Sequence, residues 1–489
     1  MRLVTEDDSM AMGRRDRAAQ GEFWIPRASL RSAPAHPFYE KLNVILAAAE
    51  FDRFAESACE RFYSGVGRPS VAPGVYFRML LIGYFEKLDS EREIAWRCAD
   101  SLSLRGFLGL PLEQATPDQS SLSRTRNRID VETHQSIFDW VLKRLAEHGL
   151  LSGGPLGIDA STLEADAAMK SIVRRDTGAT YNEFITELAQ ASGVATPTAA
   201  ELANFDRKRQ GKTVSNAEWF NPHDPDAKIA KMKDGRTHLA YKNEHVVDLQ
   251  TGAIVAVEIH HADQGDTTTM WGTLEKAAES LCEVRTDEAV AATCIENDVA
   301  DPRELGVREV VPDKGYHSAQ TLVNLEALDI RSYIAEPDRG RQCWTAKPTR
   351  GMTNAELRQE QDFKRAEQDA VYRNRRRIRG RRSKALHRRR GQFVERSFEH
   401  VLDDGGMRRV WLKGREKIAK RYLIHTAGFN LGLILRKLTG FGTPRGWADA
   451  LRAFFTRQTD RARQIGRIIL RFARHRLFPK WNTPREQAA

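Results

Sequence analysis

Two apolar segments that each lead into an aspartate constrain the fold more than any other feature of this sequence. Residues 155–158 lead into Asp159, and residues 307–312 lead into Asp313. A short apolar run bounded by turn residues is typical of a buried strand. Because ligands of an open α/β sheet collect beyond the ends of its strands, we expect both carboxylates at one edge of a common sheet. The pattern predicts an α/β fold with Asp159 and Asp313 in its ligand-binding site.

The segments between and after these aspartates predict the order strand, hairpin, helix, strand, helix, strand, helix. That order matches a ribonuclease-H-like core, in which helices cover a mixed sheet. The expected strands lie at 155–161, 239–247, 253–259, 307–313 and 330–334, and the expected helices at 267–281, 318–328 and around 394–402.

The region before the predicted sheet has a helical pattern of apolar residues. Residues 1–36 are expected to form a flexible arm, and residues 37–150 an all-α domain. Residues 116–121 form a turn and helix cap, and a basic helix follows them. A helix-turn-helix-like element would present Arg124, Arg126 and Arg128 to DNA phosphates. The alternative is a solvated helix face of an all-α domain.

Changes in composition divide the rest of the chain. We expect the catalytic domain at 151–438, with a polar insertion at about 192–235 and a basic insertion at about 338–392. A basic, helical C-terminal tail is expected at 439–489.

Charge favours a polyanionic partner. The 489 residues carry a net charge of +11, and eleven of the twenty residues from Val371 to Arg390 are Lys or Arg. A second, milder basic segment lies in the C-terminal tail. A solvated charge run is the alternative for each segment, but two of them in one chain favour nucleic acid.

The sequence gives little support for a disulfide scaffold, a zinc site, a membrane span or secretion. The five cysteines form no CxxC motif and no Cys/His cluster of zinc spacing, and no apolar run reaches the length of a membrane span. Residues 1–20 do not resemble a secretory signal. We therefore expect a cytoplasmic, nucleoid-associated protein without a membrane partner.

The strand-end aspartates suit a hard divalent cation, and a third acid is expected from a later helix. The candidates are Glu395, Glu399, Asp403 and Asp404. Apolar residues at 394, 398 and 402 mark the buried stripe of this helix, with Glu395 and Glu399 one turn apart beside it. Spacing alone leaves that choice open. It also leaves open a capping role for Asp313 at the helix that begins near Ser318.

At these residues the chain resembles bacterial insertion-sequence transposases of the DDE class, specifically the family numbered eleven-eighty-two. The likeness extends from about residue 36 to about residue 438. Its motifs are His36-Pro37-Phe38-Tyr39, Arg68-Pro69-Ser70, the segment 117–124, Gly157-Ile158-Asp159-Ala160-Ser161, Lys170-Ser171, the segments 224–227, 241–245 and 311–316, Val394-Glu395-Arg396-Ser397-Phe398, and Gly414-Arg415-Glu416-Lys417.

The resemblance implies a metal-dependent enzyme that cuts the ends of an insertion sequence and joins them to target DNA. It assigns Asp159, Asp313 and Glu395 to two Mg²⁺ ions, for which Mn²⁺ can substitute, and so selects Glu395 over Glu399. It implies double-stranded DNA as partner and, by analogy, a homodimer on that DNA. Besides the arginines of the helical domain, the expected DNA contacts are Lys314, Tyr316, Arg390, Arg396 and Lys417.

Two rival functions stay open. One is a ribonuclease-H-like nuclease that cleaves DNA without strand transfer. The other is a non-catalytic DNA-binding protein descended from a transposase.

Overall fold

The computed structural model describes most of the chain between residues 35 and 450. It omits 65–69, 195, 211–213, 233–234, 339, 341 and 349–351, and beyond residue 450 it describes only 452, 453, 456, 459, 463 and 464. The predicted N-terminal arm, apart from its last two residues, therefore lies outside the described residues. So does most of the predicted C-terminal tail.

Helices alone occupy the described part of residues 37–150, in agreement with the sequence pattern. Short polar side chains begin several of them: Asp118 accepts a hydrogen bond from the Ser121 N–H, and Asp130 accepts one from the Thr133 N–H. The elements are α1 (Pro37–Ala48), α2 (Phe51–Cys59), η2 (Glu60–Phe62), α3 (Pro73–Glu86), α4 (Glu91–Asp100), α5 (Leu102–Phe107), α6 (Gln119–Arg128) and α7 (Val131–Glu147).

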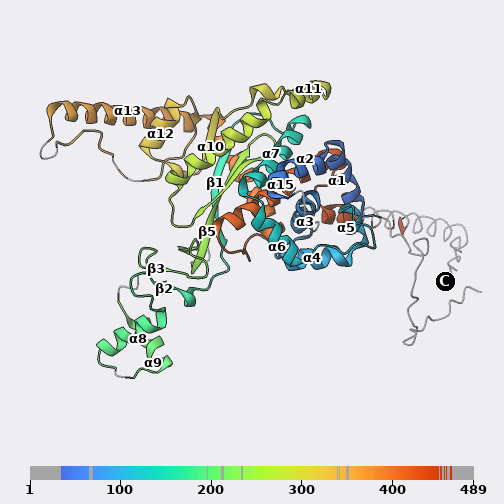
Figure 1. The fold of residues 1–489 in the computed structure, drawn as a ribbon. Helices are drawn as coiled ribbons and strands as arrows, with labels where there is room; N and C mark the ends of the chain where they lie inside the picture. The colour runs from blue at the N-terminus through green and yellow to red at the C-terminus, as the bar shows by residue number, and fades with distance from the viewer. Residues whose placement is uncertain are drawn as a thin grey trace, which may run out of the picture.

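A mixed six-stranded sheet follows, which confirms the expected α/β architecture (Figure 1). Strand β5 pairs antiparallel with β1, β4 and β6, whereas β1, β7 and β8 run parallel to one another. Both strands of the predicted hairpin are present, as β5 and β6. The strands are β1 (Leu156–Glu164), β4 (Lys228–Lys231), β5 (Thr237–Asp248), β6 (Ile254–His261), β7 (Glu309–Pro312) and β8 (Arg331–Ser332).

Helices pack on both faces of this sheet. On one face, α10 (Asp266–Arg285) contacts β5 through Thr273, which donates to Glu244. On the other face, α14 (Arg381–Phe398) contacts the same strand through Ser397, which lies 2.8 Å from the next residue, His245. Because consecutive residues of a strand point to opposite faces, these contacts place the sheet between the two helices.

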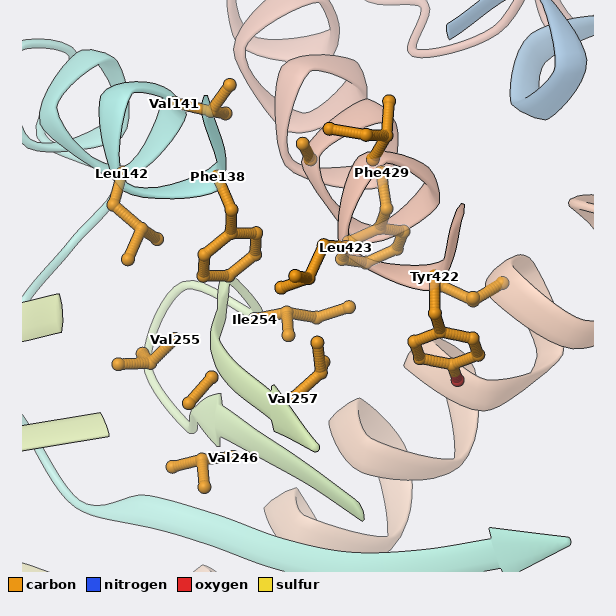
Figure 2. Packing of buried hydrophobic residues seen from close by; sticks show 14 of the residues in the cluster. Phe138, Val141, Leu142, Val246, Ile254, Val255, Val257, Tyr422, Leu423 and Phe429 are labelled. Atoms are coloured by element: carbon orange, nitrogen blue, oxygen red, sulfur yellow. The ribbon is translucent and has the colours of Figure 1, made fainter. Parts of the chain in front are cut away.

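Helix α15 (Arg415–Thr439) joins the sheet to the N-terminal helices (Figure 1). Figure 2 shows apolar side chains of α7, β6 and α15 meeting in one cluster, among them Phe138, Ile254 and Leu423. The Arg421 side chain of α15 also donates to the carbonyl oxygen of Leu88, at 2.7 Å. The helical region 37–150 and the sheet-containing region 151–438 therefore share a continuous hydrophobic core.

Two parts extend from the sheet (Figure 1). The first is a small unit of β2 (Val173–Arg174), β3 (Trp219–Phe220), α8 (Tyr181–Ala191) and α9 (Ala199–Lys208), so the polar insertion contains a helix as well as loops. The second is α13 (Asn354–Ile378), in the basic insertion. The remaining elements are η3 (Met169–Ser171), α11 (Glu288–Glu296), η4 (Pro302–Glu304), η5 (Lys314–Tyr316), α12 (Ala319–Ala327) and the π-helical turn Glu399–Asp404.

The first predicted strand is longer than the sequence pattern indicated. We expected it at 155–161, but β1 continues to Glu164 and pairs with β5 over its whole length. The reason is the length of β5, whose twelve residues provide pairing partners beyond the aspartate. Asp159 therefore lies within β1, and only its pairing with β7 stops before that residue.

Candidate active site

Asp159 and Asp313 lie side by side on neighbouring parallel strands. The last register pair between β1 and β7 joins Ile158 to Pro312, and the two aspartates directly follow these residues in the chain. Their side chains are partly exposed, by 27% and 39%. The adjacency predicted from the two apolar segments is thus present in the sheet.

Arg390 of α14 bridges this aspartate pair. Its Nη1 donates to Asp159 Oδ2 at 2.8 Å, and its Nη2 donates to Asp313 Oδ1 at 3.0 Å. Charge-assisted hydrogen bonds of this kind are roughly twice as strong as neutral ones. One guanidinium therefore holds both carboxylates.

A glycine allows α14 to approach β1 this closely. A Cβ added to Gly157 would lie 2.9 Å from Val394 Cγ2 and 3.3 Å from Arg390 Cγ. Contacts below 3 Å are essentially absent from real side chains, so a larger residue would push the helix outward. The absence of a side chain at 157 brings Arg390 within reach of the aspartates.

Burial and like charge act together on Asp159. Burial raises the pKa of its carboxyl above the ordinary value, and the neighbouring charge of Asp313 raises it further. Arg390 and the N–H of Ala160, which donates to Asp159 Oδ1 at 2.8 Å, oppose that shift. In this setting, a cation placed beside the carboxylate stabilises its charged form.

Glu395 does not join the pair in this structure. It is exposed, and its carboxylate makes no hydrogen bond or ion pair with another described residue. Five residues separate it from Arg390, which is about 140° around a regular helix, so the two side chains point in different directions. Among the described residues, no three His, Cys, Asp or Glu side chains lie close enough together to hold a metal ion.

Glu399 is exposed as well, and it begins the π-helical turn Glu399–Asp404. Single π-helical turns often occur at functional sites because they offset the side chains that follow. The structure therefore does not separate Glu395 from Glu399 by position. The capping alternative for Asp313 finds no support, because Ser318 caps α12 and the Asp313 side chain makes no cap hydrogen bond.

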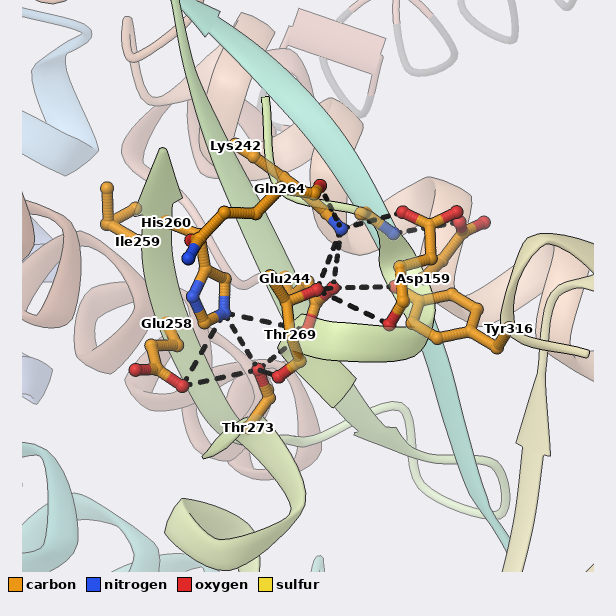
Figure 3. A network of polar contacts seen from close by, with 12 residues as sticks. Asp159, Lys242, Glu244, Glu258, Ile259, His260, Gln264, Thr269, Thr273 and Tyr316 are labelled. Atoms are coloured by element: carbon orange, nitrogen blue, oxygen red, sulfur yellow. Dashed lines mark hydrogen bonds and ion pairs between the residues drawn. The ribbon is translucent and has the colours of Figure 1, made fainter. Parts of the chain in front are cut away.

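A buried polar network lies next to the aspartate pair, and the sequence reasoning did not predict it (Figure 3). Its centre is Glu244 of β5, which is fully buried and lies 3.0 Å from Lys242 Nζ. The hydroxyl of Tyr316 donates to Glu244 at 3.1 Å. The available signal was the pair of charged residues, Lys242 and Glu244, two positions apart within the expected strand 239–247.

The predicted DNA contacts fall into two groups. Arg124, Arg128, Lys314, Arg396 and Lys417 are exposed. The other three, Arg126, Tyr316 and Arg390, are buried or engaged with acidic side chains.

Arg126 is buried and forms an ion pair with Glu91, because it lies on the face of α6 that packs against α4. Tyr316 is fully buried, and Arg390 is engaged with the two aspartates. For these residues the structure differs from the surface positions expected from sequence.

The basic run 371–390 divides in the same way. Its members that face the sheet or α12 are paired with acids, as in the contacts of Arg373 with Glu326 and of Arg375 with Glu336, each at 2.6 Å. The members without a described acidic partner are Arg376, Arg379, Arg381, Lys384, Arg388 and Arg389. The run is thus partly structural and partly available to a polyanion.

None of the described helices combines the length and apolar character that a membrane crossing requires. Comparison with protein families matches residues 29–128 to a transposase domain (DUF772). The comparisons with curated proteins and with solved structures give no match. The matched segment covers α1–α6 and ends before β1, so it supports the relationship to transposases through the helical region, while the aspartate pair lies outside it.

Proposed function

We propose that this protein is a DNA transposase of the DDE class that cuts the ends of an insertion sequence and joins them to target DNA. The observation that carries the proposal is the pairing of Asp159 with Asp313 around a single cationic group. The match of residues 29–128 to a transposase domain supports the same class of protein.

The topology supports a ribonuclease-H-like core. Neighbouring strands follow the path β6–β5–β1–β7–β8, with an antiparallel hairpin at one side and three parallel strands at the other. Helices lie on both faces of this sheet. The aspartate pair is located where β1 and β7 cease to pair, at the edge where such sheets collect their ligands.

The aspartate pair fits a hard divalent cation such as Mg²⁺, with Mn²⁺ able to substitute. Two carboxylates already converge on one positive group, and the oxygen atoms of Asp159 and Asp313 are the donors that Mg²⁺ prefers. When bound, two such ions supply nucleophile activation and leaving-group stabilisation in phosphoryl transfer. Glu395 is the proposed third ligand, and it reaches the pair only after α14 or its own side chain rearranges.

The residues of the chain have distinct tasks in this proposal. Asp159 and Asp313 would hold the cations, and Arg390 neutralises the pair in their absence. Arg124 and Arg128 of α6 and the unpaired cations of α14 bind DNA phosphates without reading sequence. The proposed domains are those expected from sequence, and a homodimer is expected because two DNA ends must be cut together.

Helix α14 lies against β1, and its exposed cations include Arg381, Lys384 and Arg388. Their spacing of three and four residues places them along one face of the helix. Glu395 lies seven residues after Arg388, on that same face. A DNA backbone bound along this stripe would therefore approach Glu395.

The test uses three components: a DNA fragment with both ends of the genomic segment that carries the gene, a target plasmid, and Mg²⁺ or Mn²⁺. Wild-type protein is expected to cut the ends and to join them to the plasmid. Asp159→Asn and Asp313→Asn are expected to abolish both steps while retaining end binding. Asp362→Asn, which changes an exposed carboxylate of α13, is the matched control and is expected to behave as wild type.

The rival functions give different products. Cleavage without a joined product would identify a nuclease, and end binding without cleavage would identify a non-catalytic descendant. Cleavage that survives Asp159→Asn would overturn the assigned site.

A further inference from the structure

The proposed reaction assigns no role to the polar network beside the aspartate pair. Tyr316 is fully buried, and its hydroxyl donates to Glu244 Oε1 at 3.1 Å (Figure 3). Tyr316 also ends the short turn that begins after Asp313, and its N–H donates to the carbonyl oxygen of Asp313 at 3.2 Å. The same residue is thus fixed to Asp313 through the backbone and to β5 through its side chain.

The turn after Asp313 lies directly on α10. A Cβ added to Gly315 would collide with Asp266 Oδ2, so only glycine fits at this position without a shift. Asp266 in turn lies 2.6 Å from Lys242 Nζ, and that ammonium group is 5.9 Å from the centre of the Tyr316 ring. The turn is therefore fixed at two successive residues, Gly315 against α10 and Tyr316 against β5.

Glu244 is a firmly held acceptor for the tyrosine. It is fully buried, Thr273 donates to its Oε2 at 2.7 Å, and Thr269 donates to its Oε1. Burial opposes its ionisation, but its hydrogen bonds and the charge of Lys242 outweigh burial and lower the pKa of Glu244 to about 2. A charged group this well fixed gives the Tyr316 hydroxyl one defined partner.

We propose that Tyr316 and Glu244 are positioning residues, which hold the turn 314–316 in place and thereby fix the Asp313 carboxylate for cation binding. This inference rests on the proposed function. Partners outside the ligand shell orient metal ligands, and their loss typically weakens metal binding about 10- to 100-fold. The inference replaces the DNA contact expected for Tyr316, because a fully buried side chain does not meet the backbone of a duplex.

The test measures Mn²⁺ binding to the full-length protein without DNA, by the electron paramagnetic resonance signal of free Mn²⁺. Tyr316→Phe removes one hydroxyl and keeps the ring, and we expect it to weaken Mn²⁺ binding about tenfold. Glu244→Gln removes the charge and keeps the shape, and it is expected to weaken binding by at least as much. If Glu244→Gln fails to fold, Tyr316→Phe decides the question.

Tyr241→Phe provides a matched control. Tyr241 is buried in the same strand as Glu244, and its hydroxyl also donates to a carboxylate, Asp224 Oδ1, at 2.6 Å. It pairs with Leu163, four residues along β1 from Asp159. Tyr241→Phe should lower the melting temperature at least as much as Tyr316→Phe and leave Mn²⁺ binding unchanged.

The outcomes separate the two proposals. If Asp313→Asn loses Mn²⁺ binding while Tyr316→Phe binds as wild type, the positioning role is wrong and the proposed function stands. If Asp313→Asn binds Mn²⁺ as well as wild type, the proposed metal site is wrong and the positioning role with it. Loss of metal-free DNA-end binding in Tyr316→Phe, with Mn²⁺ binding intact, would restore the DNA contact and overturn the inference.

Discussion

The guanidinium of Arg390 donates a 2.8 Å hydrogen bond to the carboxylate of Asp159, although 231 positions separate the two residues in sequence. The contact places a positive charge of the protein itself where a divalent cation is proposed to bind. The Arg390 side chain is only 15% exposed, so solvent screens this charge weakly. A metal ion and the guanidinium therefore compete for the same oxygen atoms.

This competition predicts that Arg390→Gln binds Mn²⁺ more tightly than wild type. A hydrogen bond to a charged group contributes about 1.5–3 kcal/mol, so removal of the competitor should tighten binding about tenfold or more. The metal-free protein should be less stable, because Asp159 and Asp313 then repel each other without a counter-charge. Titration of Mn²⁺ and thermal melting with and without metal measure the two effects.

Arg382→Gln is the control for this substitution. Arg382 lies on the same helix and pairs with Glu309 at 2.5 Å, but its side chain is 62% exposed. It should leave Mn²⁺ affinity unchanged. Equal affinity of Arg390→Gln and wild type would show that the guanidinium does not occupy the cation position.

The sequence predicted the aspartate pair because strands are encoded locally. The apolar residues directly before Asp159 and Asp313 are few and bounded by polar or turn residues, and parallel pairing then brings the two aspartates together. The full length of β1 was not predicted, since residues 162–164 join the strand only through pairing with β5. Periodicity within one segment carries no information about how far a partner strand extends.

The roles of individual basic and polar side chains were harder to predict. Arg126 and Arg128 are two positions apart on one short helix, yet the first is buried against Glu91 and the second is exposed. Arg126 lies four residues after Leu122 and three before Ile129, so the apolar spacing indicated the covered face of α6, whereas the charge of Arg126 suggested a DNA contact. Tyr316 was likewise expected at the surface because it follows a site residue, whereas its ring fills the space below the turn.

Arg124 and Arg128 are predicted to bind DNA phosphates. Each substitution, Arg124→Ala or Arg128→Ala, should weaken end binding and reduce the slope of log K against log salt by about 0.9. Fluorescence anisotropy at several salt concentrations measures the slope. Arg53→Ala, which removes a cation of α2 that is 81% exposed, is the control and should leave the slope unchanged. Unchanged slopes in both α6 variants would place the DNA on another surface.

The buried pair of Arg126 and Glu91 should instead support stability. Both side chains are less than one-tenth exposed, and removal of one partner leaves an uncompensated buried charge. Glu91→Gln is therefore predicted to destabilise the protein by about 3–5 kcal/mol, measured by chemical unfolding. The loss should be much smaller for Arg53→Ala, whose charge is exposed. A loss below about 1 kcal/mol for Glu91→Gln would contradict a buried ion pair.

His134 predicts a loss of stability in mild acid. It is fully buried beside the Tyr76 hydroxyl, which lies 3.0 Å from its Nε2, and burial lowers the pKa of its imidazole to about 3. In the unfolded chain a histidine has a pKa of about 6.5, so between these values only the unfolded state binds the proton. The free energy of unfolding should fall by about 1.4 kcal/mol for each pH unit below 6.5 from this group alone.

His134→Gln removes this dependence while it keeps a polar side chain beside Tyr76. Urea unfolding of both proteins at pH 7, 6 and 5 should show that the variant loses less stability than wild type as the pH falls. Acidic groups common to both proteins cancel in the comparison. Parallel curves would mean that the pKa of His134 is the same in the folded and unfolded protein, so that its burial does not lower it.

Gly157 should be essential for the seating of α14 on β1. In Gly157→Ala the new methyl group would lie 2.6 Å from Leu249 Cδ2 and 2.9 Å from Val394 Cγ2, and both atoms belong to packed side chains. We expect a destabilisation of about 1–3 kcal/mol, together with weaker contact between Arg390 and the aspartates. Gly154→Ala is the control, because its methyl group meets only the flexible Gln250 side chain, which can move aside. If Gly157→Ala matched Gly154→Ala in melting temperature and in Mn²⁺ affinity, the close approach of α14 would not be what brings Arg390 to Asp159.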